Sequence, residues 1–247
     1  MIRTISNGKS GLFTSQNKMD SIANNIANVN VNGYKKIEMD FNDIFYSKMN
    51  RKGCPITSDN RDKLLEGSGS RTSAIVANTS EGALKETGMK TDLAITGDGL
   101  FRLIGSNGEY FYTKDGAFSL DKDKNIVHNT GMKLEVENYN RNAMSDDFSI
   151  NENGEIYVKN KPVGKINTYS FVDRDKLVQS CGNIYQTDEE PKNSNSSIEQ
   201  GFLEQSNVDI AKELTDMIIA QRTYSMNSKS VKTGDEMWQI ANNLRNK

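Results

Sequence analysis

The apolar residues near the start of the chain recur every seven positions. The row runs through the segment from about Ile2 to Asn30, and its members are Ile5, Leu12, Met19 and Ile26, joined by Ile22 and Val29. Residues seven apart lie on one face of a helix and form a seam against a second helix. The pattern therefore predicts an N-terminal helix packed on another helix, and Gly33 is expected to end it in a left-handed conformation.

The same spacing returns at the other end of the chain, between about Val208 and Leu244. The repeating positions are Ile210, Met217, Tyr224, Val231 and Trp238, and the stripe is widened by Leu214, Ile218, Met237, Ile240 and Leu244. Ser206 or Asn207 is expected to cap this helix, and Asp209 suits its positive end. Two long amphipathic helices are thus predicted at the two ends of the chain, and we expect them to pair.

Between these segments the period changes from seven to two. Apolar residues alternate with polar ones from Leu93 to Leu120, and the runs are separated by Gly-Asp-Gly, Gly-Ser-Asn-Gly and Lys-Asp-Gly, which are typical of hairpin turns. Further strands are expected at 132–136, 155–159 and 163–172. The predicted fold class is therefore mainly β with long α-helical termini: the N- and C-terminal helices pair as a coiled coil, and an antiparallel β module is inserted between them in the chain.

Polar stretches suggest where the domains meet. Residues 1–33 and 206–247 are expected to form the helical assembly domain, and residues 91–190 the β domain. Residues 34–90 are interpreted as an extended connector that carries a polar insert at about 46–71, and residues 191–205 as a linker.

Asparagines are concentrated at the end of the first predicted helix, although asparagine is a mediocre helix former. Asn24 and Asn28 lie one helical turn apart, beside the apolar seam. Amides in such a row can bond to neighbouring helices and fix their register. We interpret Asn24 and Asn28 as an inter-subunit polar row, whereas Asn30 and Asn32 fit a solvated helix end.

Charge and targeting signals restrict the classes of protein that fit. The 247 residues include 31 basic and 33 acidic side chains, a net charge of -2, and this balance argues against a nucleic-acid binder. No run of roughly 18 apolar residues predicts a membrane span, and the N-terminus lacks the apolar core of a secretory signal peptide. We therefore expect a cytoplasmic protein or one exported without a cleaved signal. Cys54 and Cys181 are interpreted as incidental thiols.

A search for catalytic or binding chemistry finds no convincing constellation. The single histidine, His128, is expected to be a surface or hydrogen-bonded side chain, and no His or Cys cluster has metal-ligand spacing. The Gly-rich stretches at 67–70 and 97–99 lack the context of phosphate loops. The clustered carboxylates fall in polar turns. We predict no enzyme activity, no cofactor, no metal and no small-molecule substrate.

Long stretches of the chain resemble the bacterial flagellar rod and hook proteins. The terminal stretches are "MDSIANNIANVNVNGYKK" at 19–36 and "GFLEQSNVDIAKELTDMIIAQRTYSMNSKSVKTGDEMWQIANNL" at 201–244. The central ones are "EGALKETGMKTDLAITGDGLF" at 81–101 and "YTKDGAFSLDKDKNIV" at 112–127. The resemblance covers nearly the whole chain in order.

The resemblance implies a structural subunit that forms a homo-polymer, with the terminal helices lining a tube and the β module outside them. It also implies torque transmission from motor to hook, contacts with other rod proteins and the hook, and passage through the flagellar export apparatus to the basal body. The length argues against a hook protein. The polar insert and the stretch "FNDIFYSKM" at 41–49 favour the distal rod type, with the proximal rod type as the alternative.

Two further alternatives stay open. Phe41 and Phe45 resemble the short apolar element by which early export substrates dock at the export gate, but they also fit two aromatic residues that cover a helix end. A secreted β module with a binding or enzymatic role is the alternative from a different class, and it would need a clustered site within residues 90–190, which the sequence does not offer.

Overall fold

A computed structural model describes residues 2–44, 46–48, 65–145, 147–171, 176–194 and 196–245. The chain divides into two compact units, named here the helix unit and the β unit. The helix unit comprises Met1–Ala27, Ile37–Asn78 and Asp209–Lys247, and the β unit comprises Asn28–Lys36 and Thr79–Val208. Two packed terminal helices and a mostly antiparallel β module between them confirm the predicted fold class.

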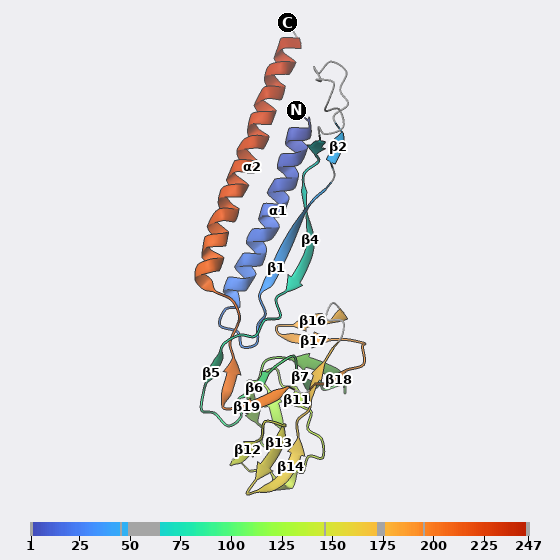
Figure 1. The fold of residues 1–247 in the computed structure, drawn as a ribbon, viewed down its shortest axis with the longest axis vertical. Helices are drawn as coiled ribbons and strands as arrows, with labels where there is room; N and C mark the ends of the chain where they lie inside the picture. The colour runs from blue at the N-terminus through green and yellow to red at the C-terminus, as the bar shows by residue number, and fades with distance from the viewer. Residues whose placement is uncertain are drawn as a thin grey trace. The chain divides into compact units, whose positions relative to one another are not determined.

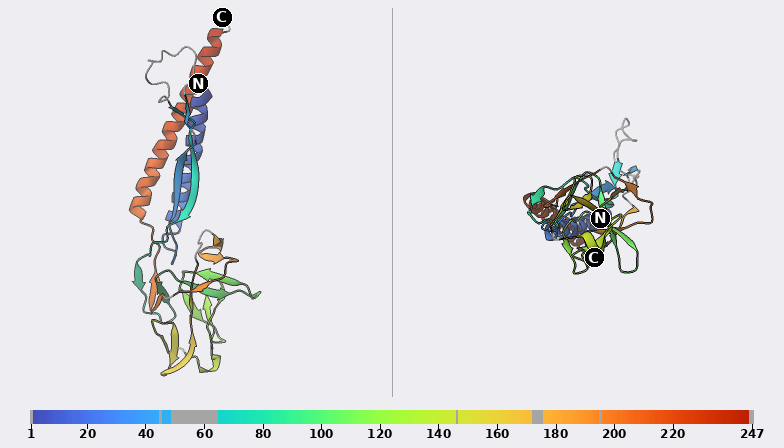
Figure 2. Two further views of the ribbon diagram at one scale, coloured as in Figure 1. Left: turned by 45° about the vertical axis from the view of Figure 1, so that its right-hand side comes forward. Right: turned by 90° about the horizontal axis from the view of Figure 1, so that it is seen from below.

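The helix unit contains two long helices and a β-ribbon. Helix α1 spans Ile2–Ala27 and α2 spans Ile210–Arg245. Strand β1 (Ile37–Asp43) pairs with β4 (Ser70–Ala77), and this antiparallel ribbon lies along α1 (Figures 1 and 2). Strands β2 (Tyr46–Lys48) and β3 (Leu65–Gly67) form a second short antiparallel pair.

The ends of both helices differ from the predicted ones. Helix α1 ends at Ala27, and Gly33, which has a φ of 65°, belongs to a turn of the β unit. The expected stop at Gly33 is wrong. The helix ends at Ala27, and the asparagines between Asn28 and Gly33 lie in the turns that follow it. Helix α2 is capped by Asp209, whose Oδ1 accepts hydrogen bonds from the backbone N–H groups of Ala211 (2.9 Å) and Lys212 (3.3 Å). Asp209 therefore takes the capping position that was assigned to Ser206 or Asn207.

Small residues let α1 and α2 approach closely. A Cβ atom added to Gly8 would lie 2.5 Å from Cγ2 of Val231, and one added to Gly234 would lie 3.1 Å from Cγ1 of Ile5. Because residues early in α1 meet residues late in α2, the two helices are antiparallel. The contact row on α2 consists of four positions seven apart: Glu213, Ala220, Asn227 and Gly234.

Asn25 connects three elements of the helix unit. Its side-chain Nδ2 donates to the backbone O of Ile37 (3.0 Å), and its Oδ1 accepts from the backbone N–H of Ile37 (2.9 Å). The same Nδ2 also donates to Oε2 of Glu213 in α2 (3.3 Å). Asn25 is only 1% exposed. One buried amide of α1 therefore holds the start of β1 and the first turns of α2.

The β unit is built from short strands. They are β5 (Leu84–Glu86), β6 (Leu93–Thr96), β7 (Leu100–Ile104), β8 (Tyr110–Thr113), β9 (Phe118–Leu120), β10 (Ile126–His128), β11 (Lys133–Leu134), β12 (Phe148–Ile150), β13 (Glu155–Val158), β14 (Lys161–Lys165), β15 (Thr168–Ser170), β16 (Val178–Cys181), β17 (Ile184–Gln186), β18 (Lys192–Asn193), β19 (Ser197–Gln200) and β20 (Phe202–Glu204). The alternating runs between Leu93 and Leu120 form strands β6 to β9, as predicted.

The strands pair antiparallel in one large and several small sheets. The large sheet has the order β16-β17-β8-β7-β11-β10-β9, with β15 on β7 and β18 on β15, and a smaller sheet has the order β12-β13-β14. The run 163–172, expected as one strand, is split between β14 and β15. Residues 191–205, expected as a linker, contain β18, β19 and β20, of which β19 pairs with β6 and β20 with β5.

The principal hydrophobic core belongs to the β unit. Its buried side chains come from strands of both the large and the small sheets, and they include Phe101, Leu103, Phe148, Ile156 and Ile198. Phe101 and Phe118 meet edge to face, with ring centroids 5.2 Å apart. The β unit therefore has the packed interior of an ordinary globular domain.

Replacing Asn25 by Asp tests the connecting role of its amide. The substitution keeps the size of the side chain but removes both N–H donors and places a carboxylate against Glu213 and the backbone O of Ile37. We expect a loss of about 2–4 kcal/mol in the free energy of unfolding of the helix unit, measured by urea titration of the helical circular dichroism signal. The control is Asn24→Asp at an exposed position, and equal losses in the two variants would contradict the connecting role.

Ala220→Leu tests the close approach of the two helices. Ala220 is buried in the contact row of α2, so the added atoms must separate the helices. We expect a cost of about 1–3 kcal/mol in the free energy of unfolding, together with faster hydrogen exchange in α1. Ala241→Leu places the same side chain at an exposed position of α2 and is expected to cost little. Unchanged exchange in the Ala220 variant would refute the proposed contact row.

Candidate assembly surface

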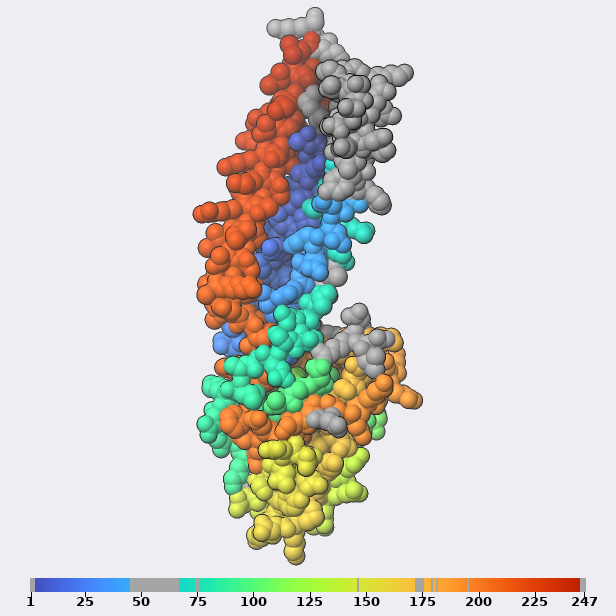
Figure 3. Space-filling view, in the orientation of Figure 1, coloured from blue at the N-terminus to red at the C-terminus, as the bar shows by residue number. Residues whose placement is uncertain are grey.

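Helix α2 exposes a large set of apolar side chains. Met226 is 68% exposed and Trp238 is 47% exposed, and in Figure 3 the orange and red side chains of α2 project along its length. The exposed set on α2 is Ile210, Leu214, Ile218, Ile219, Tyr224, Met226, Met237, Trp238, Ile240 and Leu244. So many exposed apolar side chains on one helix are typical of a surface that associates with other chains.

The helical phase of these residues shows which sides of α2 are apolar. At 100° per residue, Tyr224 and Trp238 lie about 40° to one side of the contact row, and Ile219 and Met226 lie about 100° to the other side. A fully polar row lies nearly opposite the contact row, and its members are Thr215, Arg222, Lys229, Glu236 and Asn243. Helix α2 therefore carries apolar residues on both flanks and a polar row on its outward face, with the exposed Ile218 beside that row.

The helix unit buries little apolar surface by itself. Among its described residues, Ile22 and Ala220 are the hydrophobic residues that are buried, whereas the buried apolar core lies in the β unit. A helix that carries apolar side chains on two flanks is normally covered on both of them. The described part of the helix unit therefore leaves most of its apolar side chains at least partly exposed, as a protein–protein interface does before its partner binds.

The predicted seam residues fall into three groups. Ile22 is buried, and Ile5 and Val231 lie at the contact between the helices. Half-buried positions are Leu12, Met19, Ile26 and Met217, and exposed positions are Ile210, Leu214, Tyr224 and Trp238. Four of the six seam residues predicted on α2 are thus exposed. The contact with α1 is made instead mainly by the contact row, which lies four residues before the predicted row.

The amide that joins elements within the helix unit was missed by the sequence interpretation. Asn24 is exposed on α1 and Asn28 is half-buried in the turn that follows, so their role between subunits stays a prediction. Asn25 makes the buried contacts instead. One signal was available in the sequence, because Asn25 lies three residues after Ile22, on the same helix face.

Two other predicted features are only partly described. Phe41 lies in strand β1, is partly exposed and has the Lys18 ammonium 5.7 Å from its ring centroid. Phe45 and Cys54 lie outside the described residues, as does most of the polar insert at 46–71. The backbone of Cys181 ends strand β16. The interpretation of Phe41 and Phe45 as an export element therefore stays a prediction.

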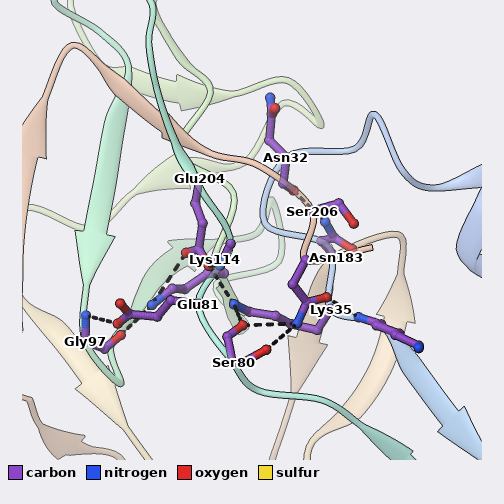
Figure 4. Close-up of polar contacts among 12 residues, drawn as sticks. Asn32, Lys35, Ser80, Glu81, Gly97, Lys114, Asn183, Glu204 and Ser206 are labelled. Atoms are coloured by element: carbon purple, nitrogen blue, oxygen red, sulfur yellow. Dashed lines mark hydrogen bonds and ion pairs between the residues drawn. The ribbon is translucent and has the colours of Figure 1, made fainter. Parts of the chain in front are cut away.

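A buried charge cluster occupies the β unit (Figure 4). Nζ of Lys35 lies 2.5 Å from Oε1 of Glu204 and donates to the backbone O of Ser80 (2.8 Å). Nζ of Lys114 lies 3.7 Å from Oε2 of Glu204 and donates to the backbone O of Gly97 (2.5 Å). The three side chains are 13%, 2% and 7% exposed for Lys35, Glu204 and Lys114.

Burial lowers the pKa of the Lys114 ammonium, against the attraction of the Glu204 carboxylate, which acts in the opposite direction. Both ammonium groups and Oε1 of Glu204 are hydrogen-bonded to backbone groups of neighbouring segments, whereas Oε2 of Glu204 has the Lys114 ammonium at 3.7 Å and no hydrogen bond. Such an arrangement positions chain segments, and it holds no nucleophile next to a base.

The remaining titratable candidates are structural. His128 is buried, with Nε2 at 3.2 Å from Oδ2 of Asp115 and Nδ1 at 2.9 Å from Oγ1 of Thr130. The expectation of a hydrogen-bonded histidine is confirmed, and the surface alternative is wrong. Among the described residues, no group of three or more His, Cys, Asp or Glu side chains is arranged to hold a metal ion. Neither of the helices in the described ranges is long and apolar enough to cross a membrane.

Comparison with protein families places three models on the chain in order. The family "Flagella basal body rod protein" matches residues 5–35, and "Flagellar hook protein FlgE/F/G D1 domain" matches residues 94–158. The model "Flagellar basal body rod FlgEFG protein C-terminal" matches residues 199–244. The first match covers most of α1 and the turn after it, the second lies in the β unit, and the last covers β20 and most of α2.

Curated proteins match over nearly their full length. The "Flagellar basal-body rod protein FlgG" of Borreliella burgdorferi is 35% identical over 270 residues, covering 99% of both chains. The protein of the same name from Bacillus subtilis is 34% identical and covers 99% of this chain and 100% of its own. The "Flagellar hook-basal body complex protein FlhP" of Bacillus subtilis is 27% identical with the same coverage. The chain therefore belongs to the flagellar rod and hook family, among its basal-body rod proteins.

Proposed function

We propose that this protein is a structural subunit of the distal flagellar rod, which polymerises with copies of itself into a tube and transmits torque from the motor to the hook. The observation that carries the proposal is the apolar surface of α2. Both flanks of this helix are apolar and exposed, while the described part of the helix unit buries only Ile22 and Ala220 as hydrophobic residues. Neighbouring subunits would bury the remaining apolar surface.

The phase of α2 favours a tube over a closed dimer. Two apolar flanks require a neighbour on each side, and a repeated head-to-tail contact generates an open helical assembly when its rotation does not close. The polar row of α2, which includes Arg222, Lys229 and Glu236, would then face the water inside the tube. In this arrangement Asn24 and Asn28 would bond between subunits and hold one register under load.

Partners and location follow from the same proposal. The subunit would contact other rod proteins and the hook, and it would have a mechanical rather than a catalytic role. The full-length match to relatives named basal-body rod protein FlgG supports a rod subunit over a hook protein. The stretch at 41–49 supports the distal type over the proximal one. Export through the flagellar apparatus without a cleaved signal peptide belongs to the proposal as well.

Acidic substitutions on one flank of α2 test the assembly surface. Ile219→Asp combined with Met226→Asp places two charges where a neighbour would pack, and both side chains are exposed in the single subunit. We expect the free energy of unfolding to change by less than about 1 kcal/mol in total and polymerisation to be lost, as measured by light scattering and electron microscopy.

The matched control adds the same two charges to the polar row. Thr215→Asp combined with Asn243→Asp is expected to leave assembly and motility intact. Normal polymer yield from the Ile219/Met226 variant would contradict the proposed assembly surface. An equal loss of assembly in the control would contradict it as well.

A secretion assay tests the export element. We expect Phe41→Ala combined with Phe45→Ala to lower the secreted amount of the protein severalfold, because an export gate that binds aromatic rings would lose both contacts. The amount inside the cell and the circular dichroism of the purified variant are measured in parallel. Normal secretion of a folded variant would assign the two rings to packing alone.

A further inference from the structure

The β unit connects to the helix unit through segments that gather around Glu204. The chain passes between the units after Ala27, Lys36, Asn78 and Val208. Three of these connections begin within two residues of Lys36, Ser80 and Asn207, and Asn207 is hydrogen-bonded to both Lys36 and Ser80. Oδ1 of Asn207 accepts from the backbone N–H of Lys36 (2.7 Å), and its Nδ2 donates to the backbone O of Ser80 (3.1 Å).

Glu204 joins the same segments through its carboxylate and its backbone. Its Oε1 accepts from Nζ of Lys35 and from the backbone N–H of Gly82 (3.0 Å). Its backbone O accepts from the backbone N–H of Gly33 (2.8 Å). Glu204 itself belongs to β20, which pairs with β5. Glu204 therefore makes two hydrogen bonds to segment 28–36 and one to segment 79–83. Glu204 itself lies in the segment that leads to α2.

Close packing leaves these segments little freedom. A Cβ atom added to Gly82 would lie 1.8 Å from the backbone O of Gln205, and one added to Gly33 would lie 2.9 Å from the backbone carbonyl carbon of Lys114. Lys114 then contributes the second cation beside Glu204. The segments are thus held by backbone contact as well as by charge.

We propose that Glu204 is the positioning residue of a clasp, formed with Lys35, Gly82 and Asn207, that makes three of the four connections of the β unit, those after Lys36, Asn78 and Val208, separate together or not at all. The physical reason is the buried charge. If segment 28–36 were pulled away with Lys35, the Glu204 carboxylate would lose its nearest cation while buried, which is strongly unfavourable. A load on one connection is therefore shared by the other two.

The clasp extends the proposed function, on which its mechanical role rests. In a rod subunit that transmits torque, the chain segments that join the two units carry load. Three connections that are bonded to the same clasp resist that load together. Connections without such bonds would separate from the β unit one at a time. The clasp itself is a property of the β unit and can be tested without rods.

Hydrogen exchange of the full-length chain tests the clasp. Glu204→Gln keeps an acceptor for Gly82 but removes the charge that pairs with Lys35 and Lys114. We expect exchange to accelerate by about 10-fold or more at the amides of Gly33, Gly82 and Lys36. Lys36 is decisive, because its own bond to Asn207 is untouched by the substitution. The control is Glu199→Gln on the neighbouring strand β19, which is expected to leave these amides unchanged.

Two outcomes would overturn the clasp. Acceleration confined to Gly82 would show that the connections open independently. An equal acceleration at Phe101 and Leu103, in the core, would show that the substitution only destabilises the β unit. The double variant Lys35→Met with Glu204→Gln gives a second test. If the two residues act as one clasp, the double variant accelerates exchange no more than the stronger single variant does. Multiplied effects of the two substitutions would refute the coupling.

A motility assay separates the clasp from the function on which it rests. Cells that carry Glu204→Gln are expected to assemble rods and swim in dilute medium but to lose swimming speed severalfold in viscous medium, relative to Glu199→Gln cells. Loosened amides with normal swimming under load would overturn the mechanical role. Failure of the rod proposal itself would appear separately, as normal assembly of the Ile219/Met226 variant.

Discussion

The buried amide of Asn25 connects α1, β1 and α2, and the arrangement of the helix unit depends on it. An amide offers both an acceptor and two donors, so Asn25 satisfies the backbone N–H and O of Ile37 while it also reaches Glu213. The unit buries few hydrophobic residues that could define the same geometry by packing. A polar contact therefore supplies the specificity that a hydrophobic core supplies elsewhere, as buried polar groups do in coiled coils.

The two units divide stability and association between them. The β unit has a packed core around Phe101 and Ile156, and it is a finished domain by that measure. The helix unit pairs its helices through small residues such as Gly8, Ala220 and Gly234, and this leaves the larger apolar residues of α2 outside the pair. These uncovered side chains are the surface that we propose meets neighbouring subunits.

The charge cluster around Glu204 belongs to the β unit. It lies close in sequence to three of the points where the chain passes to the helix unit. It contains three ionic side chains that are largely buried, and their burial is costly unless every partner is present. That cost is what makes the connections act together, because the loss of any partner exposes the others to the same penalty. Stability and mechanical coupling are therefore two consequences of one set of contacts.

The sequence alone determined the long helices, the change to alternating strands and the membership of the flagellar rod family. Periods of seven and two are local properties of the chain, and long family stretches are specific. It predicted the strands β6 to β9 closely, but it placed the end of α1 at Gly33 rather than Ala27 and treated residues 191–205 as a linker. It also assigned the helix contact to Ile210, Tyr224 and Trp238. Only the tertiary structure showed that Ala220 and Gly234 make this contact and that Asn25 and Glu204 hold the segments, because hydrogen bonds between residues up to 188 positions apart leave no periodic trace in the sequence.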